Sequence, residues 1–136
     1  MGVGLLCQDL RLEGEPPAER MKQLSVRIDR PAAEAYEFLS RPENFAKWAS
    51  WVTRTAQSPA AVRFIDRNSH GVLDHSVRLA RGGSAYVPLR VIANGDACNL
   101  VLTLFRQPDV SDEKFATDAE WVMRDLQAAK RLLEGS

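Results

Sequence analysis

His75 is the residue of this sequence that is best placed to do chemistry. It lies in the segment 72–79 (VLDHSVRL), where alternation puts it on the same face as Leu73, Val77 and Leu79. An imidazole on an apolar face can exchange a proton with a bound carbonyl or hydroxyl group, as aldol-type cyclisation or dehydration requires. The alternative is a buried imidazole that hydrogen-bonds only a neighbouring group of the protein. We therefore expect His75 to face a cavity, as a catalytic acid or base, as a ligand contact or as a core residue.

Two charged residues lie near His75 in the predicted sheet. Asp74 precedes it directly, so in a regular strand the Asp74 carboxylate points to the opposite face and forms no dyad with the imidazole. Arg90 and Tyr86 share one face of the segment 85–93, whose other face is apolar. We expect Arg90 on the outer surface, because charges are rarely buried unpaired. The reversed register would instead turn its guanidinium group into the pocket, toward a carboxylate or enolate.

No pattern in the sequence is typical of a metal site, a nucleophile or a phosphate-binding loop. No second ligand follows His70 or His75 at a metal-binding spacing. Cys7 and Cys98 lie far apart, which favours two ordinary thiols in a reducing compartment over a disulfide. No serine stands in a nucleophile elbow, and the Gly-Gly turn after Arg81 is too short to cradle a phosphate. We predict neither a metal nor a cofactor.

Length and charge limit the classes of protein to which the chain can belong. Its 136 residues suffice for one domain with a core of its own. Lysine plus arginine (18) equals aspartate plus glutamate (18), which argues against a nucleic-acid binder. No segment has the pattern of a membrane span or of a secretory signal. We therefore expect a cytoplasmic protein without nucleic-acid partners.

The domain is expected to begin after a tail. Residues 1–20 contain several glycines and prolines and have no sustained apolar period, whereas a regular pattern starts at Lys22. We predict an N-terminal tail of residues 1–20 and a single domain of residues 21–136.

The elements that would position His75 and its neighbours follow from periodicity and turn signals. Four consecutive strands with short turns between them predict an antiparallel meander. Two short helices follow the first strand, one opened by Pro31 and one after Pro42, and a long helix runs from a Ser111 cap to Gly135. The strands are expected at residues 22–28, 51–55, 61–66, 72–79, 85–93 and 98–106, with 51–55 the weakest.

The order of these elements resembles that of the START-like helix-grip superfamily, also called SRPBCC. The likeness is carried by residues 30–39 (RPAAEAYEFL), 41–48 (RPENFAKW) and 115–134 (FATDAEWVMRDLQAAKRLLE). Within the superfamily the chain is most similar to the polyketide cyclase/dehydrase-like group. The resemblance implies an α+β helix-grip fold: a curved antiparallel sheet of six or seven strands wrapped around a long C-terminal helix, with two short helices after the first strand. Seven strands are usual, and the short segment 49–59 leaves six here.

A sheet that wraps a helix in this way would enclose an apolar cavity, and we predict that it binds a small hydrophobic molecule such as a lipid. One alternative is a cyclase or dehydratase of polyketide-type substrates with His75 as the acid or base. Another is an interaction module with a vestigial pocket, for which a homodimer is one form. The residues expected to contact the ligand are Trp48, Phe64, His75, Leu89, Leu102, Leu104, Val122 and Leu126.

Overall fold

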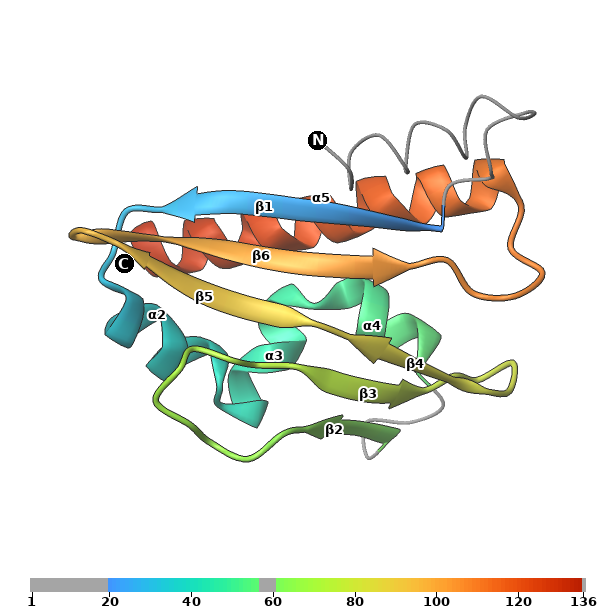
Figure 1. Cartoon of the computed structure of the whole chain (residues 1–136), viewed down its shortest axis with the longest axis horizontal. Helices are drawn as coiled ribbons and strands as arrows, with labels where there is room; N and C mark the ends of the chain where they lie inside the picture. Colours follow the sequence, from blue (N-terminus) through green and yellow to red (C-terminus); the bar gives the residue numbers. More distant parts are fainter. Residues whose placement is uncertain (1–19, 57–60, 136) are drawn as a thin grey trace, which may run out of the picture.

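The computed structural model describes residues 20–56 and 61–135. Within these residues the chain forms six strands and four helices (Figure 1). The strands are β1 (Met21–Ile28), β2 (Val62–Phe64), β3 (His75–Arg78), β4 (Ser84–Val87), β5 (Leu89–Asn94) and β6 (Ala97–Phe105). The helices are α2 (Ala32–Leu39), α3 (Pro42–Trp48), α4 (Ser50–Thr55) and α5 (Asp112–Glu134). The expected order of one strand, short helices, a run of strands and a long final helix is confirmed.

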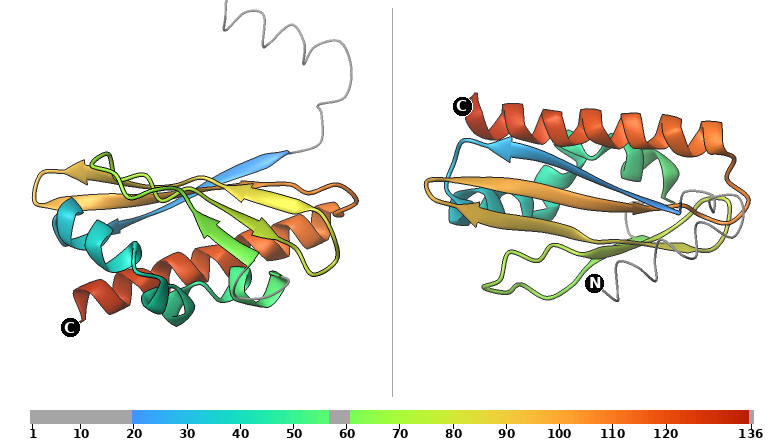
Figure 2. Two further views of the ribbon diagram at one scale, coloured as in Figure 1. Left: turned by 90° about the horizontal axis from the view of Figure 1, so that it is seen from below. Right: turned by 45° about the horizontal axis from the view of Figure 1, so that its top comes forward.

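The strands form two three-stranded antiparallel sheets, in the orders β1-β6-β5 and β2-β3-β4. The segment before β3 joins them, because the Leu73 amide donates to the Leu89 carbonyl (2.7 Å) and the Val91 amide donates to the Gly71 carbonyl (2.8 Å). Figure 2 shows that all four helices lie on the same face of this combined surface, with the long α5 across it. The expected α+β architecture of strands curved around a C-terminal helix is thus present.

Helix α5 has the boundaries and the buried face that its sequence predicts. Ser111 caps it, since its hydroxyl oxygen accepts from the Lys114 amide (3.1 Å), and Asp112 and Glu113 occupy the first turn. The apolar stripe at helical spacing is buried against the sheets. Its members are Phe115, Ala119, Val122, Leu126, Ala129 and Leu133.

Four local expectations differ from the structure. The segment 51–55, expected as a weak strand, is helix α4, and tertiary contacts described below override its β-branched composition. The segment 85–93 is divided at Pro88, which has no amide to donate to a ladder. The regular part of 72–79 is only β3, because residues 71–73 pair with β5 instead. Pro31 caps α2 rather than standing inside it.

Two further observations concern the boundaries of the domain and its relation to membranes. Residues 1–19 of the predicted tail, with Cys7, lie outside the described residues, so the domain boundary remains a prediction. In the ranges 20–56 and 61–135, no helix combines the length and the apolar character needed to cross a bilayer.

Candidate functional site

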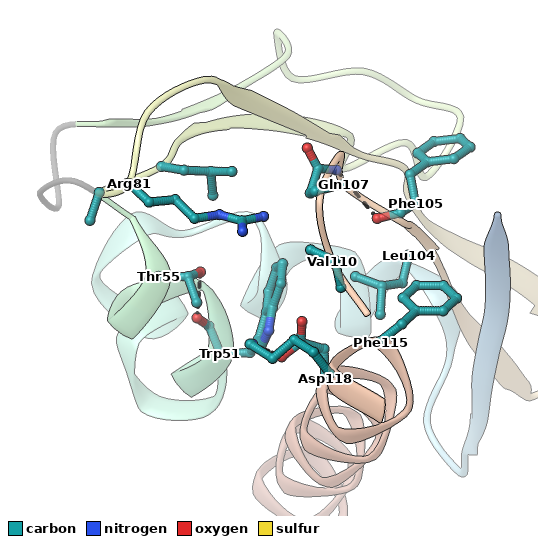
Figure 3. Close-up of a pocket in the computed structure, with 12 residues that line it drawn as sticks. Trp51, Thr55, Arg81, Leu104, Phe105, Gln107, Val110, Phe115 and Asp118 are labelled. Atoms are coloured by element: carbon teal, nitrogen blue, oxygen red, sulfur yellow. Dashed lines mark hydrogen bonds and ion pairs between the residues drawn. The ribbon is translucent and has the colours of Figure 1, made fainter. Parts of the chain in front are cut away.

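A cavity of about 200 Å³ lies at the end of the sheets where α5 begins (Figure 3). We call it the outer cavity. Its walls come from α4, the turn between β3 and β4, the end of β6, the connection to α5, and the first turns of α5. Most of this lining is apolar, so the cavity suits the hydrophobic body of a small molecule. The apolar lining includes Trp51, Leu79, Ala80, Leu104, Val110 and Phe115.

Arg81 supplies a positive charge at the outer cavity that no described residue neutralises. It stands in the turn between β3 and β4, and its guanidinium group projects over the cavity (Figure 3). Among the described residues it makes no hydrogen bond or ion pair. The other charged groups of the lining compensate each other, since Lys114 Nζ lies 2.5 Å from the buried Asp118 carboxylate. Arg81 therefore gives the cavity a net positive potential.

A much smaller space lies between the helices and the sheets. This inner void has a volume of about 10 Å³, which is room for one water molecule. Its walls include Phe45, Trp48, Trp51, His75, Val122 and Asp125. Side chains therefore fill most of the hollow expected along α5. Trp51 lines both the inner void and the outer cavity, so its side chain stands between them.

His75 is almost completely buried and lies among aromatic rings. Its ring centroid is 5.4 Å from that of Phe45 and 4.9 Å from that of Phe64. Burial lowers the pKa of His75, so the ring is neutral near pH 7. The Leu73 carbonyl lies 3.0 Å from Nδ1 and can only accept, so Nδ1 carries the hydrogen. The lone pair of His75 Nε2 has no partner.

Two tryptophans next to His75 are also incompletely bonded. Among the side chains that the structure describes, the indole N–H groups of Trp48 and Trp51 are buried and have no acceptor. Buried polar atoms without partners are uncommon in native proteins. In the part of the chain that the structure describes, the three residues with such side-chain atoms all line the inner void.

Asp74 lies on the opposite side of the sheet from the inner void. It accepts hydrogen bonds from the Tyr86 hydroxyl (2.7 Å), the Leu89 amide (2.9 Å) and two nitrogens of Arg90 (2.9 and 2.8 Å). The bond from Arg90 is the largest of the effects that lower the pKa of Asp74 from 3.8 to about 2. The outward position of Arg90 and Tyr86 is confirmed, as is the absence of a dyad between Asp74 and His75.

Asp125 on α5 explains why the segment 50–55 is helical. It accepts hydrogen bonds from the Ser50 hydroxyl (2.6 Å) and the Trp51 amide (2.7 Å) at the start of α4. The Trp121 indole in turn donates to the Ser50 hydroxyl oxygen (2.7 Å). Burial raises the pKa of Asp125. A side chain that is distant in sequence thus caps α4 and fixes Trp51 at the wall of both spaces.

The predicted ligand contacts are distributed over both spaces and the core. Leu104 lines the outer cavity. Trp48, His75, Leu102 and Val122 line the inner void. Phe64, Leu89 and Leu126 line neither space: Phe64 packs on His75, and the other two are fully buried.

Sequence reasoning did not identify Arg81 as a site residue. A turn arginine next to two glycines has the pattern of an ordinary solvated turn. No sequence signal distinguishes such an arginine from one that projects over a cavity. The lining residues from the first turns of α5 were also not identified, because only the fold brings them to the end of β6.

Among the described residues, no metal centre competes with this site. Across residues 20–56 and 61–135, no three histidine, cysteine, aspartate or glutamate side chains meet as ligands would. The thiol of Cys98 is buried, and burial raises its pKa, so it is not an activated nucleophile.

No protein-family model and no curated protein matches this chain. Solved structures do match. DynU16, a protein in the dynemicin biosynthetic locus, shares 14% identity over 87% of this chain with a TM-score of 0.61, and the chain spans 49% of its length. A START superfamily protein from Mycobacterium smegmatis shares 11% identity over 86% of this chain and 99% of its own, with a TM-score of 0.54. The Zhui aromatase/cyclase from Streptomyces sp. R1128 shares 15% identity over 85% and 93%, with a TM-score of 0.51. At these identities the likeness establishes the fold alone.

Proposed function

We propose that this chain, which has the START-like helix-grip fold, binds a small molecule with an apolar body and an anionic group in its outer cavity. One observation carries the proposal: an arginine that has no partner among the described residues projects over a cavity whose walls are mostly apolar. Arg81 would bind the anion, preferably a planar carboxylate that its two nitrogens can meet together.

The size of the outer cavity restricts the ligand. About 200 Å³ is below the roughly 300–1,000 Å³ of sites for drug-sized molecules. A molecule with one ring or a short chain fits this volume better than a polycyclic one. Burial of the ligand's apolar body against Trp51, Leu104 and Phe115 would supply much of the affinity. The ligand class is therefore a small aromatic or aliphatic acid.

The alternative of a cyclase or dehydratase has one observation in its favour, the free lone pair of His75 Nε2. A neutral imidazole can act as a base toward a bound substrate. However, the space beside His75 holds only about 10 Å³, so a substrate would have to displace side chains before it met the ring. Binding in the outer cavity is thus the simpler proposal. An interaction module, a homodimer and a cytoplasmic location remain predictions from the sequence.

The proposal is tested with 3-phenylpropanoate, whose binding is measured by isothermal titration calorimetry. We expect the neutral analogue 3-phenylpropan-1-ol to bind more weakly to the same protein. The variant Arg81→Gln should lower the affinity for 3-phenylpropanoate by roughly tenfold or more, since a hydrogen bond to a charged group contributes about 1.5–3 kcal/mol.

Arg78→Gln is the matched control. Arg78 is an exposed arginine at the end of β3 that does not line the outer cavity, so its loss should leave the affinity unchanged. If Arg81→Gln binds the acid as well as the wild type does, or if the acid does not bind at all, the proposal is wrong.

A further inference from the structure

Three of the residues that line the inner void have a buried polar atom without a partner. His75 Nε2, Trp48 Nε1 and Trp51 Nε1 are buried and unbonded, and the three residues line this one space. They come from three elements, β3, α3 and α4, so no single helix or strand accounts for the coincidence. Each unpaired buried group costs stability. Their gathering at one void points to an occupant that satisfies all three.

The hydrogen-bonding capacity of the three atoms specifies the chemistry of that occupant. His75 Nδ1 donates to the Leu73 carbonyl, so Nε2 can only accept. The indole nitrogens of Trp48 and Trp51 can only donate. An occupant that satisfies all of them must donate one hydrogen bond and accept two. A hydroxyl oxygen does this, whereas a carbonyl oxygen leaves His75 without a donor and an ammonium group cannot accept.

Trp51 separates the inner void from the outer cavity. Trp51 contributes to the walls of both spaces. Its main chain is fixed by Asp125, but no hydrogen bond holds its indole ring. A ligand that extends from the outer cavity to His75 would therefore have to displace this ring, which no hydrogen bond opposes.

We propose that the inner void is the inner end of the ligand site, where His75, Trp48 and Trp51 bind a hydroxyl group of the ligand. This deepens the proposed function: the ligand class becomes a small hydroxy acid, with its anionic group at Arg81 and its hydroxyl group at the inner void. In the empty protein the void has room for one water molecule in place of the hydroxyl group. The role of His75 is recognition, as a hydrogen-bond acceptor.

The test compares two probes that differ by one hydroxyl group, 3-(4-hydroxyphenyl)propanoate and 3-phenylpropanoate, by calorimetry with the full chain. We expect the hydroxylated probe to bind the wild-type protein at least tenfold more tightly. The methyl ether, 3-(4-methoxyphenyl)propanoate, should lose this advantage because it cannot donate to His75. In His75→Phe the ratio of the two affinities should fall to about one. In the control His70→Phe, which changes the exposed histidine, the ratio should persist.

Trp48→Phe provides a second variant, which removes a donor while it keeps an aromatic ring, and it too should reduce the ratio. Arg81→Gln should lower the affinity for both probes by the same factor, so the ratio of the two affinities should not change. Equal affinities of the two probes for the wild-type protein would overturn the inference that the inner void binds a hydroxyl group of the ligand. A water molecule would then be the occupant of the void, and the proposed function would still stand. Failure of both probes to bind would overturn the proposed function itself.

Discussion

Asp74 and His75 are adjacent in the chain and belong to different parts of the molecule. His75 faces the helices, whereas the Asp74 carboxylate accepts hydrogen bonds from Tyr86, Leu89 and Arg90 on the other side of the sheet. These partners stand on both sides of the break that Pro88 makes between β4 and β5. Asp74 therefore holds the two sheets together where the regular ladder stops.

The ionised form of Asp74 should stabilise the fold. Its pKa is about 2 in the folded protein and 3.8 ordinarily, so the folded state favours the charged carboxylate. The stabilisation, about 2 kcal/mol, is complete above about pH 5 and is lost as the pH falls through 4 and toward 2. Urea denaturation of Asp74→Asn should show a free energy of unfolding lower by about 2 kcal/mol at pH 7, and a much smaller loss at pH 2.

The matched control for Asp74→Asn is Asp66→Asn, which removes an exposed carboxylate. Its free energy of unfolding should stay within about 0.5 kcal/mol of the wild type. A loss in Asp74→Asn that is independent of pH would show that the charge of Asp74 contributes nothing.

At the scale of elements, the packing of the two sheets depends on a close crossing of two segments. The loop before β3 crosses β5 at Gly71, whose φ is +74°. A β-carbon at this glycine would collide with the carbonyl oxygen of Val91, and the Val91 amide bonds the Gly71 carbonyl at 2.8 Å. Both the backbone conformation and the close approach thus require glycine at this position.

Gly71→Ala should therefore cost more stability than an alanine at an ordinary turn glycine. Gly95 is the matched comparison, because its φ is +64° but nothing lies within 4 Å of an added β-carbon. We expect Gly95→Ala to lower the free energy of unfolding by about 1–2 kcal/mol, from backbone strain alone. The loss of free energy of unfolding in Gly71→Ala should be clearly larger than this in the same urea titration. Equal losses would show that the crossing can relax.

At the scale of the whole molecule, the two sheets share one core. Val77 and Val87 of the second sheet belong to the same buried cluster as Leu100 of the first sheet and Leu126 of α5. Neither sheet can bury its apolar face without the other elements. The division of the strands into two sheets is therefore a division of hydrogen bonding and not of folding units.

Unfolding should accordingly be a single cooperative transition. Circular dichroism, which follows the helices, and tryptophan fluorescence, which follows the region around α4, should give the same midpoint in urea. Two separate midpoints would contradict a shared core.

The local elements could be predicted from the sequence because their signals are periodic. Alternation gave β1 and β6 to within a residue or two, and the 3.6-residue stripe with its Ser111 cap gave α5. The same reasoning placed Arg90 outside. It failed at residues 51–55, where a carboxylate of α5 caps a helix in a segment whose composition favours a strand.

The amino-acid sequence by itself determined the order of the elements and the faces that they bury, since both follow from periodicity along one segment. Only the tertiary structure decided that the interior beside His75 is nearly filled, that the outer cavity lies at the start of α5, and that Arg81 projects over it. The physical reason is that the volume of a cavity is the small remainder left by side chains from several distant segments. That remainder depends on how they pack against each other, and no single stretch of sequence records it.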